Sequence, residues 1–325
     1  MVGIPLSIVD STVDGDRILE IVDDCVRLRI NVDHGAHLFH LEDVRSGTQL
    51  LYTDPAGSRD YAVGGWYELF PNAGPACDFG GSSITRHGDV QHRPWTVDVE
   101  ADDGNEVVIR LRTTSRDLPF SIEKRVAVRA SSGRIRLDER IARHQDGAAD
   151  TADELPYLWG QHVTFGLPFL EGAVFELPGG ELHGSVDDSG SGDARTETRG
   201  PLGAFPVSDG TSMDLTRFPT GPFDAMLFSD RLASGAATVR NPRLGIAARL
   251  TWDIDAYPYL WFWGTRSADV DGLTACAIEP QASDIPSLAD AHTDGRAPVL
   301  ARGGERSSWI ELTLSVDSSP GIADE

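Results

Sequence analysis

The stretch RIRLDERI, residues 134–141, alternates strictly between two kinds of position. One set of alternate positions reads Ile, Leu, Glu and Ile, and the other reads Arg, Arg, Asp and Arg. Residues 26–33 (VRLRINVD) and 310–317 (IELTLSVD) repeat this period of two. Because successive side chains of a strand point to opposite faces of a sheet, these stretches predict strands with one buried face and one exposed face.

Turn signals separate the alternating stretches. Asp-Gly pairs begin at Asp14, Asp103, Asp146, Asp209, Asp271 and Asp294, and Ser132-Gly133 lies between two alternating runs. Such pairs readily adopt the positive φ angles that tight hairpins need. No stretch of twelve or more residues carries apolar positions at helical spacing, so helices should be few and short. The pattern predicts an all-β protein built as an antiparallel β-sandwich.

The length of 325 residues suits one large β-sandwich, and we expect a single domain over residues 1–325. Residues 179–200 (GGELHGSVDDSGSGDARTETRG) are polar and glycine-rich, which predicts a long loop within that domain. Residues 318–325 are expected to form a loose C-terminal tail.

The composition limits which kinds of molecule the protein is expected to bind. A formal charge of −23 opposes binding to nucleic acid or to anionic lipid, because both require a cationic surface. A small neutral or locally recognised ligand is therefore expected. The N-terminus lacks a basic start followed by an apolar block, and no run approaches the length of a membrane span, which favours a cytoplasmic protein.

Several common kinds of site lack support in the sequence. His34, His37 and His40 lie three residues apart, and on a strand this spacing sends His37 to the face opposite the other two, which disfavours a metal site. Neither a GxSxG elbow nor a phosphate-binding glycine loop is present. The three cysteines show no CxxC spacing and are expected to act as small buried apolar residues.

Three apolar segments, two of them with aromatic residues, each contain one candidate ionisable group. His162 lies in LPYLWGQHVTFGLPF (155–169), Glu279 in LTACAIEPQAS (273–283) and Asp224 in GPFDAMLF (221–228). An ionisable side chain in such surroundings is costly to leave unpaired, and burial raises the pKa of a carboxyl toward values useful in a general base. Each group alone is more often a satisfied structural residue, but together they predict a pocket.

Short motifs in a fixed order carry a family resemblance. They are Gly35-Ala36, Phe70-Pro71-Asn72, His87-Gly88, the GxHxxF segment Gly160–Phe165, Phe223-Asp224, Tyr257-Pro258-Tyr259-Leu260 leading to Trp263, and Ile278-Glu279-Pro280. In this order and spacing the chain resembles the aldose 1-epimerase (galactose mutarotase-like) superfamily over about residues 35 to 281. The resemblance implies a β-supersandwich that interconverts the α and β anomers of an aldose without a metal or cofactor.

The resemblance also implies roles for individual residues. Glu279 would remove the proton from the C1 hydroxyl, and His162 would protonate the ring oxygen. His87 would hydrogen-bond the sugar, and Asp224 would hold ring hydroxyls. His92, five residues after His87, would point to the other face of a continuous strand.

Further contacts to the sugar are expected from Trp66 and Trp263, by packing on its C–H face, and from Arg86, by bonding its hydroxyls. Many members carry an arginine soon after the Phe-Pro step, whereas this chain reads NAGP at residues 72–75. The identity of the aldose, and whether it is phosphorylated, therefore stay open. Two alternative functions also stay open: a non-catalytic carbohydrate-binding protein, or another sugar-modifying enzyme such as a lyase or hydrolase. The sequence does not decide between a monomer and a homodimer.

Overall fold

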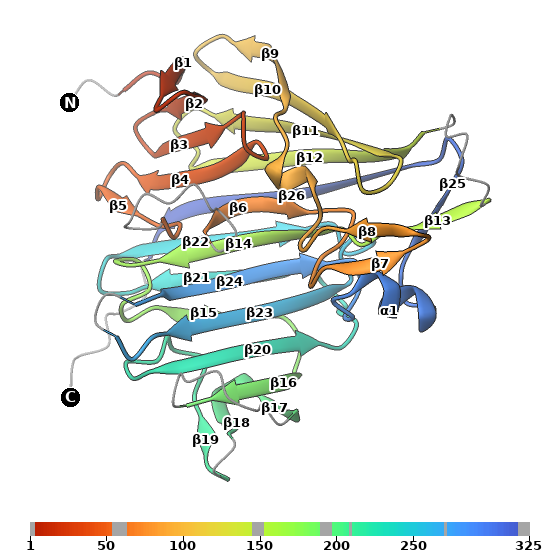
Figure 1. Ribbon diagram of the computed structural model, residues 1–325. Helices are drawn as coiled ribbons and strands as arrows, with labels where there is room; N and C mark the ends of the chain where they lie inside the picture. The colour runs from red at the N-terminus through yellow and green to blue at the C-terminus, as the bar shows by residue number, and fades with distance from the viewer. Residues whose placement is uncertain are drawn as a thin grey trace.

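The computed structural model describes residues 4–53, 64–144, 153–188, 197–207, 210–269 and 272–317. In these segments two large antiparallel sheets lie one on the other, and helix is confined to α1 (Leu288–Thr293) and the 3-10 turns η1 (Val90–His92) and η2 (Leu202–Ala204) (Figure 1). The prediction of an all-β sandwich with few short helices is confirmed. No helix in the described segments is long and apolar enough to cross a membrane.

The larger sheet has twelve strands among the described residues. In spatial order they are β1 (Ser7–Val13), β2 (Asp16–Val22), β3 (Val26–Asn31), β4 (His37–Asp43), β6 (Gly65–Leu69), β14 (Gly160–Gly166), β24 (Thr274–Gln281), β23 (Tyr259–Arg266), β20 (Phe223–Ser229), β16 (Glu181–Asp187) and β17 (Thr198–Pro201), with β5 (Thr48–Gln49) paired to β4.

The second sheet has eight strands among the described residues. Their order is β15 (Val174–Glu176), β21 (Ala236–Asn241), β22 (Ile246–Trp252), β26 (Glu305–Val316), β12 (Arg134–Arg143), β11 (Phe120–Arg129), β10 (Glu106–Thr114) and β9 (Thr96–Asp102). Short two-stranded pairs complete the chain: β7 (Cys77–Phe79) with β8 (Ser82–Ile84), β13 (Glu154–Pro156) with β25 (Val299–Ala301), and β18 (Phe205–Pro206) with β19 (Ser212–Met213).

The alternation seen in the sequence sets which face each strand buries. In β12 the side chains of Ile135, Leu137 and Ile141 are fully buried between the sheets, while the intervening arginines and Asp138 are exposed or half-buried. The strands β3 and β26 follow the same rule. The burial of these apolar faces against each other is the main driving force for stacking the two sheets.

The turn signals have two outcomes. Asp14-Gly15 joins β1 to β2 with φ angles of 51° and 92°, and Ser132-Gly133 closes the turn between β11 and β12, as hairpin pairs should. Asp294-Gly295 instead follows the helix α1, where Gly295 with φ of 67° ends the helix. A residue pair that tolerates positive φ can therefore form a hairpin turn or end a helix.

The prediction of one long loop over residues 179–200 is wrong. Residues 181–187 form β16 and residues 198–201 form β17, at the edge of the larger sheet. Leu182 and Val186 face the core, and Gly184 leaves no room for a side chain because its backbone lies against Met226. A strand whose inward positions include a glycine lacks the hydrophobic alternation by which strands are recognised. Residues 189–196, and the predicted tail at 318–325, lie outside the described residues.

A buried ion pair links the two sheets. The ammonium of Lys124 on β11 donates to both carboxylate oxygens of Glu68 on β6, at 2.7 and 2.9 Å, and to the carbonyl of Ala36 at 2.9 Å. Beside it, Glu139 on β12 accepts from Gln161 Nε2 and from the Tyr257 hydroxyl. Burial and the nearby Glu68 carboxylate raise the pKa of Glu139 well above its ordinary value. The ion pair and these hydrogen bonds therefore join the two sheets across the core.

Candidate active site

The strands β14 and β24 bring His162 and Glu279 together. The register that pairs Val163 with Ile278 places His162 directly opposite Glu279, on the face of the sheet that points away from the core. His162 Nε2 lies 3.7 Å from Glu279 Oε1, and the two residues are only 5% and 3% exposed. Both side chains line a cavity of about 440 Å³, which is within the usual size range of small-molecule sites.

Neighbouring groups hold the imidazole of His162 in place. Its Nδ1 lies 2.7 Å from the Thr164 hydroxyl, which turns Nε2 toward Glu279. The ring of Tyr67 stacks on the His162 ring at a centroid distance of 4.9 Å and an interplanar angle of 15°. Since Tyr67 is itself buried, the imidazole has little freedom to rotate.

Burial controls the protonation of both groups. It raises the pKa of Glu279 to about 8, although a hydrogen bond from Gln281 opposes the shift. Burial, together with the nearby His87, lowers the pKa of His162 well below its ordinary value. At neutral pH the pair therefore holds one proton, and that proton lies mainly on the carboxyl.

Gly160, the first residue of the GxHxxF segment, makes room for this arrangement. Gly160 pairs with Gln281 across the two strands, and a Cβ at position 160 would collide with the Gln281 side-chain amide. Gln281 Nε2 donates to Glu279 Oε2 at 3.3 Å. A glycine is needed here because the group that supports the carboxylate occupies the space of its side chain.

A turn after β8 brings Arg86 and His87 to the cavity. His87 has a left-handed φ of 60°, followed by Gly88 at 74°, where any Cβ would collide with the carbonyl of Phe70. The His87 ring lies 5.9 Å from the His162 ring, and burial lowers the pKa of His87 to about 4. Arg86 is exposed and also lines the cavity. The two residues thus place a neutral imidazole and a cation on the same wall.

The segment NAGP at residues 72–75 builds the adjoining wall. Ala73, Gly74 and Pro75 line the cavity, while the buried amide of Asn72 donates to the carbonyls of Gly74, Pro75 and Thr85 at 3.3, 2.7 and 3.1 Å. Asn72 Oδ1 in turn accepts from the backbone N–H of Leu288. In this chain the residue after the Phe-Pro step joins neighbouring loops and does not line the cavity.

Aromatic and apolar side chains form a further part of the cavity lining. They are Met226 and Phe228 of β20 and Trp261 and Trp263 of β23, and Pro286 adds a further contact. Of these residues, Trp263 was predicted from the sequence, whereas Met226 and Phe228 were not. Both follow Asp224 at intervals of two, so the alternation of β20 carried the signal that would have found them.

Trp66 does not reach the cavity, so its prediction as a sugar-stacking residue is wrong. Trp66 is fully buried between the sheets, and its Nε1 donates to Gln161 Oε1 at 2.7 Å. It pairs with Val163, which faces the core, whereas the next residue Tyr67 pairs with His162. A single residue step along β6 separates the core face from the site face.

Asp224 and His92 lie outside the cavity lining. Asp224 shares the site face of β20 with Met226, two residues away, but stands farther along the strand. His92 is exposed in the turn η1. The expectation that His92 lies outside the pocket agrees with its place in this turn, although the parity of a continuous strand is not the reason, and His92 is still close enough to His87 to help lower its pKa.

The three early histidines, His34, His37 and His40, each contact a different group. His37 Nε2 bonds the Gly64 carbonyl at 2.6 Å, His34 lies 3.6 Å from Asp16, and His40 lies 3.4 Å from Glu42. Each of the three has its own neighbour, so they do not converge on one point.

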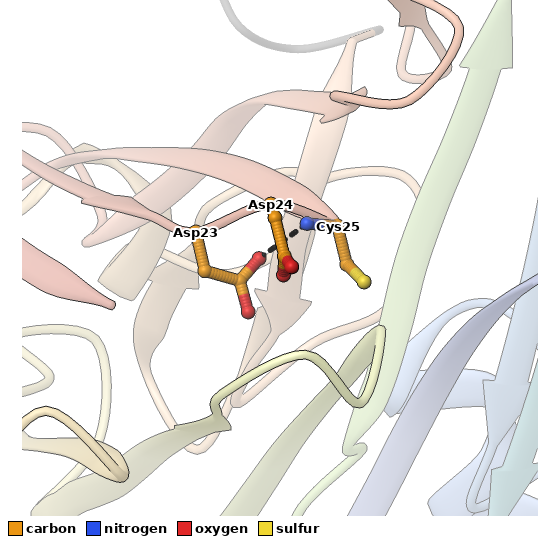
Figure 2. Close-up of side chains that lie close together, drawn as sticks. All are labelled: Asp23, Asp24 and Cys25. Atoms are coloured by element: carbon orange, nitrogen blue, oxygen red, sulfur yellow. Dashed lines mark hydrogen bonds between the residues drawn. The ribbon is translucent and has the colours of Figure 1, made fainter. Parts of the chain in front are cut away.

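Asp23, Asp24 and Cys25 form the one cluster of potential metal ligands in the described part of the chain, at the turn between β2 and β3 (Figure 2). Asp23 Oδ1 accepts from the backbone of Cys25 and Val26 at 2.8 Å, as the dashed line to Cys25 in Figure 2 shows, and Asp23 Oδ2 accepts from Ser131. These bonds give the Asp23 carboxylate a structural role in the turn.

Known proteins share this fold and define its class, the galactose mutarotase-like β-sandwich. A galactose mutarotase-like protein from Clostridium acetobutylicum superposes with a TM-score of 0.68 at 16% identity, over 96% of this chain and 99% of that one. A candidate aldose 1-epimerase from Klebsiella pneumoniae gives a TM-score of 0.68 at 20% identity, over 94% of this chain and 81% of that one. At these identities the likeness establishes the fold.

The chain belongs to the family of the domain of unknown function DUF4432, whose model matches residues 69–314. The match covers β14 and β24 with both residues of the buried pair. In sequence, the chain is 27% identical over 218 residues to the plasmid-encoded protein LacX of Lactococcus lactis subsp. lactis, across 64% of this chain and 67% of LacX.

Proposed function

We propose that this protein is an aldose 1-epimerase, which interconverts the α and β anomers of an aldose by opening and closing the sugar ring. The observation that carries the proposal is the facing pair of Glu279 and His162, buried in a cavity with 3.7 Å between Oε1 and Nε2. The similarity in fold to mutarotase-like proteins supports the same activity.

The reaction needs one proton acceptor and one proton donor. As the C1 hydroxyl loses its proton to one member of the pair, the ring oxygen receives a proton from the other, and the C1–O5 bond breaks to give the open-chain aldehyde. Rotation about the C1–C2 bond and the reverse transfers give the other anomer. The proton count of the pair is the same before and after turnover, so the chain's own side chains complete the cycle.

The roles implied by the family resemblance are Glu279 as the base and His162 as the acid. The shared proton lies mainly on Glu279, so the ionised arrangement is a minor form in equilibrium with the neutral one. Both forms contain one proton, and their ratio does not depend on pH. His87, held neutral by burial, supplies a hydrogen bond to the sugar, and Arg86 bonds hydroxyls at the cavity wall.

Polarimetry or NMR exchange on freshly dissolved α-glucose and α-galactose tests the proposal. The wild type should accelerate anomer equilibration, and Glu279→Gln and His162→Ala should each lower the rate by about 10²–10⁴-fold, the usual contribution of one proton-transfer group. Glu305→Gln, which changes an exposed glutamate on the other sheet, is the matched control and should keep the wild-type rate.

Two results would contradict the proposal. Sugar binding by NMR titration without any rate acceleration would indicate a carbohydrate-binding protein on this fold. Release of a cleaved product would indicate a lyase or hydrolase.

A further inference from the structure

A row of side chains runs straight across the site face of the larger sheet. Strand register pairs Glu279 with Trp261, Trp261 with Phe228, and Phe228 with His183. Cross-strand partners in an antiparallel sheet point to the same face. The row therefore begins at the proposed reaction pair and extends over β23 and β20 to β16.

The aromatic rings in this row contact one another. Phe228 meets Trp261 edge-on at 5.5 Å and 76°, and the His183 ring stacks on Phe228 at 5.6 Å and 28°. Phe228 lines the cavity, whereas His183 lies one strand beyond its lining. Both side chains are half-buried, so they keep exposed surface. We call these two rings the Phe228–His183 platform.

The platform extends farther than the chemistry requires. Proton transfer needs groups around C1 and the ring oxygen, which His162 and Glu279 supply. From β24 to β16 the row crosses three strand spacings, roughly 14 Å, more than a single sugar ring covers. An aromatic surface joined to the cavity at this distance offers a second place for a sugar's C–H face to pack.

Polar side chains flank the platform and could supply the hydrogen bonds that sugar hydroxyls need. Ser185 on β16 pairs with Met226 of the cavity wall and lies two residues along the strand from His183, on the same face. Arg199 on β17 pairs with His183, and both oxygens of Asp230 hold its guanidinium, at 2.7 and 3.0 Å. The surface beyond Phe228 thus alternates aromatic and hydrogen-bonding groups in the manner of a carbohydrate site.

We propose that the sugar site continues across β20 onto β16, and that the substrate carries a second glycosyl unit which packs on the Phe228–His183 platform. The substrate class is then a reducing disaccharide or longer oligosaccharide, whose free anomeric carbon lies between His162 and Glu279. This inference rests on the proposed epimerase function.

The test compares mutarotation of the monosaccharides glucose and galactose with that of the reducing disaccharides maltose, cellobiose, lactose and melibiose. At least one disaccharide should have a higher kcat/KM than its monosaccharide. His183→Ala should lower kcat/KM for that disaccharide by about 3- to 10-fold, the range expected for one aromatic packing contact, through KM. It should leave the monosaccharide rate unchanged.

Two variants control for general damage to the sheet. His183→Phe keeps an aromatic face and should retain the preference for the disaccharide. His40→Ala removes another half-buried histidine of the same sheet, which contacts Glu42 far from the row, and should change neither rate.

The outcomes separate this inference from the epimerase proposal. Acceleration with monosaccharides alone, or a disaccharide preference that His183→Ala leaves intact, overturns the second glycosyl site and keeps the epimerase. If no sugar is turned over, titration by NMR decides: tighter binding of a disaccharide that His183→Ala weakens supports the extended site although the epimerase fails. Absence of binding by every sugar tested overturns both.

Discussion

Glu279 and His162 face each other across neighbouring strands, with 3.7 Å between Oε1 and Nε2, and both are buried. Burial shifts their pKa values in opposite senses, up for the carboxyl and down for the imidazole. The pair therefore binds its first proton at a pH near 8 and a second only in acid. Over the interval between, it holds the single proton that ring opening requires.

The pH dependence of kcat/KM should follow from this proton count. Activity should be flat across neutral pH and fall above about pH 8, because the pair then loses its only proton as Glu279 ionises. On the acid side it should fall only well below the ordinary pKa of histidine, where His162 gains a second proton. Polarimetric rates between pH 4 and 10 measure the profile. A midpoint near pH 6.5 would contradict the lowered pKa of His162.

The tryptophans should separate into structural and ligand-binding groups. Trp263→Ala removes a cavity wall and should raise KM for the sugar, with a small change in stability, because its ring is only half-buried. Trp66→Phe removes the donor to Gln161 in the core and should cost about 1–3 kcal/mol of unfolding free energy, with KM unchanged. Urea unfolding and initial rates on the same preparations check both. A raised KM in Trp66→Phe would place that ring near the ligand after all.

The sequence predicts faces of strands better than it predicts their partners. Alternation locates β3, β12 and β26 because one face of each contacts water and the other contacts apolar side chains. It also predicts that Glu279 and His162 lie in apolar surroundings. That they face each other depends on the pairing of β14 with β24, two strands distant in sequence, which the family resemblance implied and spacing alone does not define.

The predictions from sequence that were wrong or incomplete have local causes. Trp66 and Tyr67 both lie in a strand that is buried on both faces, so hydrophobicity gives no sign of which one faces the cavity. β16 was predicted as loop because its inward positions include Gly184, and its outward positions are polar, as befits a strand near an edge. The role of Asn72 in joining loops depends on contacts with Thr85 and Leu288, which are remote in sequence.

The buried ion pair should dominate the effect of changing Lys124, the one lysine of the chain. Lys124→Met leaves the carboxylate of Glu68 buried without its cation and should lower the unfolding free energy by about 3–5 kcal/mol. Adding Glu68→Leu removes the unpaired charge and should recover part of that loss. Urea unfolding measures each step. The neighbour Arg125, exposed and paired with Glu100, is the control, and its change to Met should cost at most about 1 kcal/mol.

Gly160→Ala tests whether Gln281 positions the carboxyl of Glu279. The added Cβ would collide with the Gln281 side-chain amide and displace the group that donates to Glu279 Oε2. We expect kcat to fall about 10- to 100-fold, since a small misplacement of a reacting group has effects of this size, and the unfolding free energy to fall by about 1–3 kcal/mol from overpacking. Gly180→Ala, where no atom lies within 4 Å of the new Cβ, should behave as the wild type. In the double variant Gly160→Ala/Gln281→Ala the collision is gone, so stability should recover while kcat stays low, because Glu279 still lacks its donor. Recovery of both would show that Gln281 only fills space.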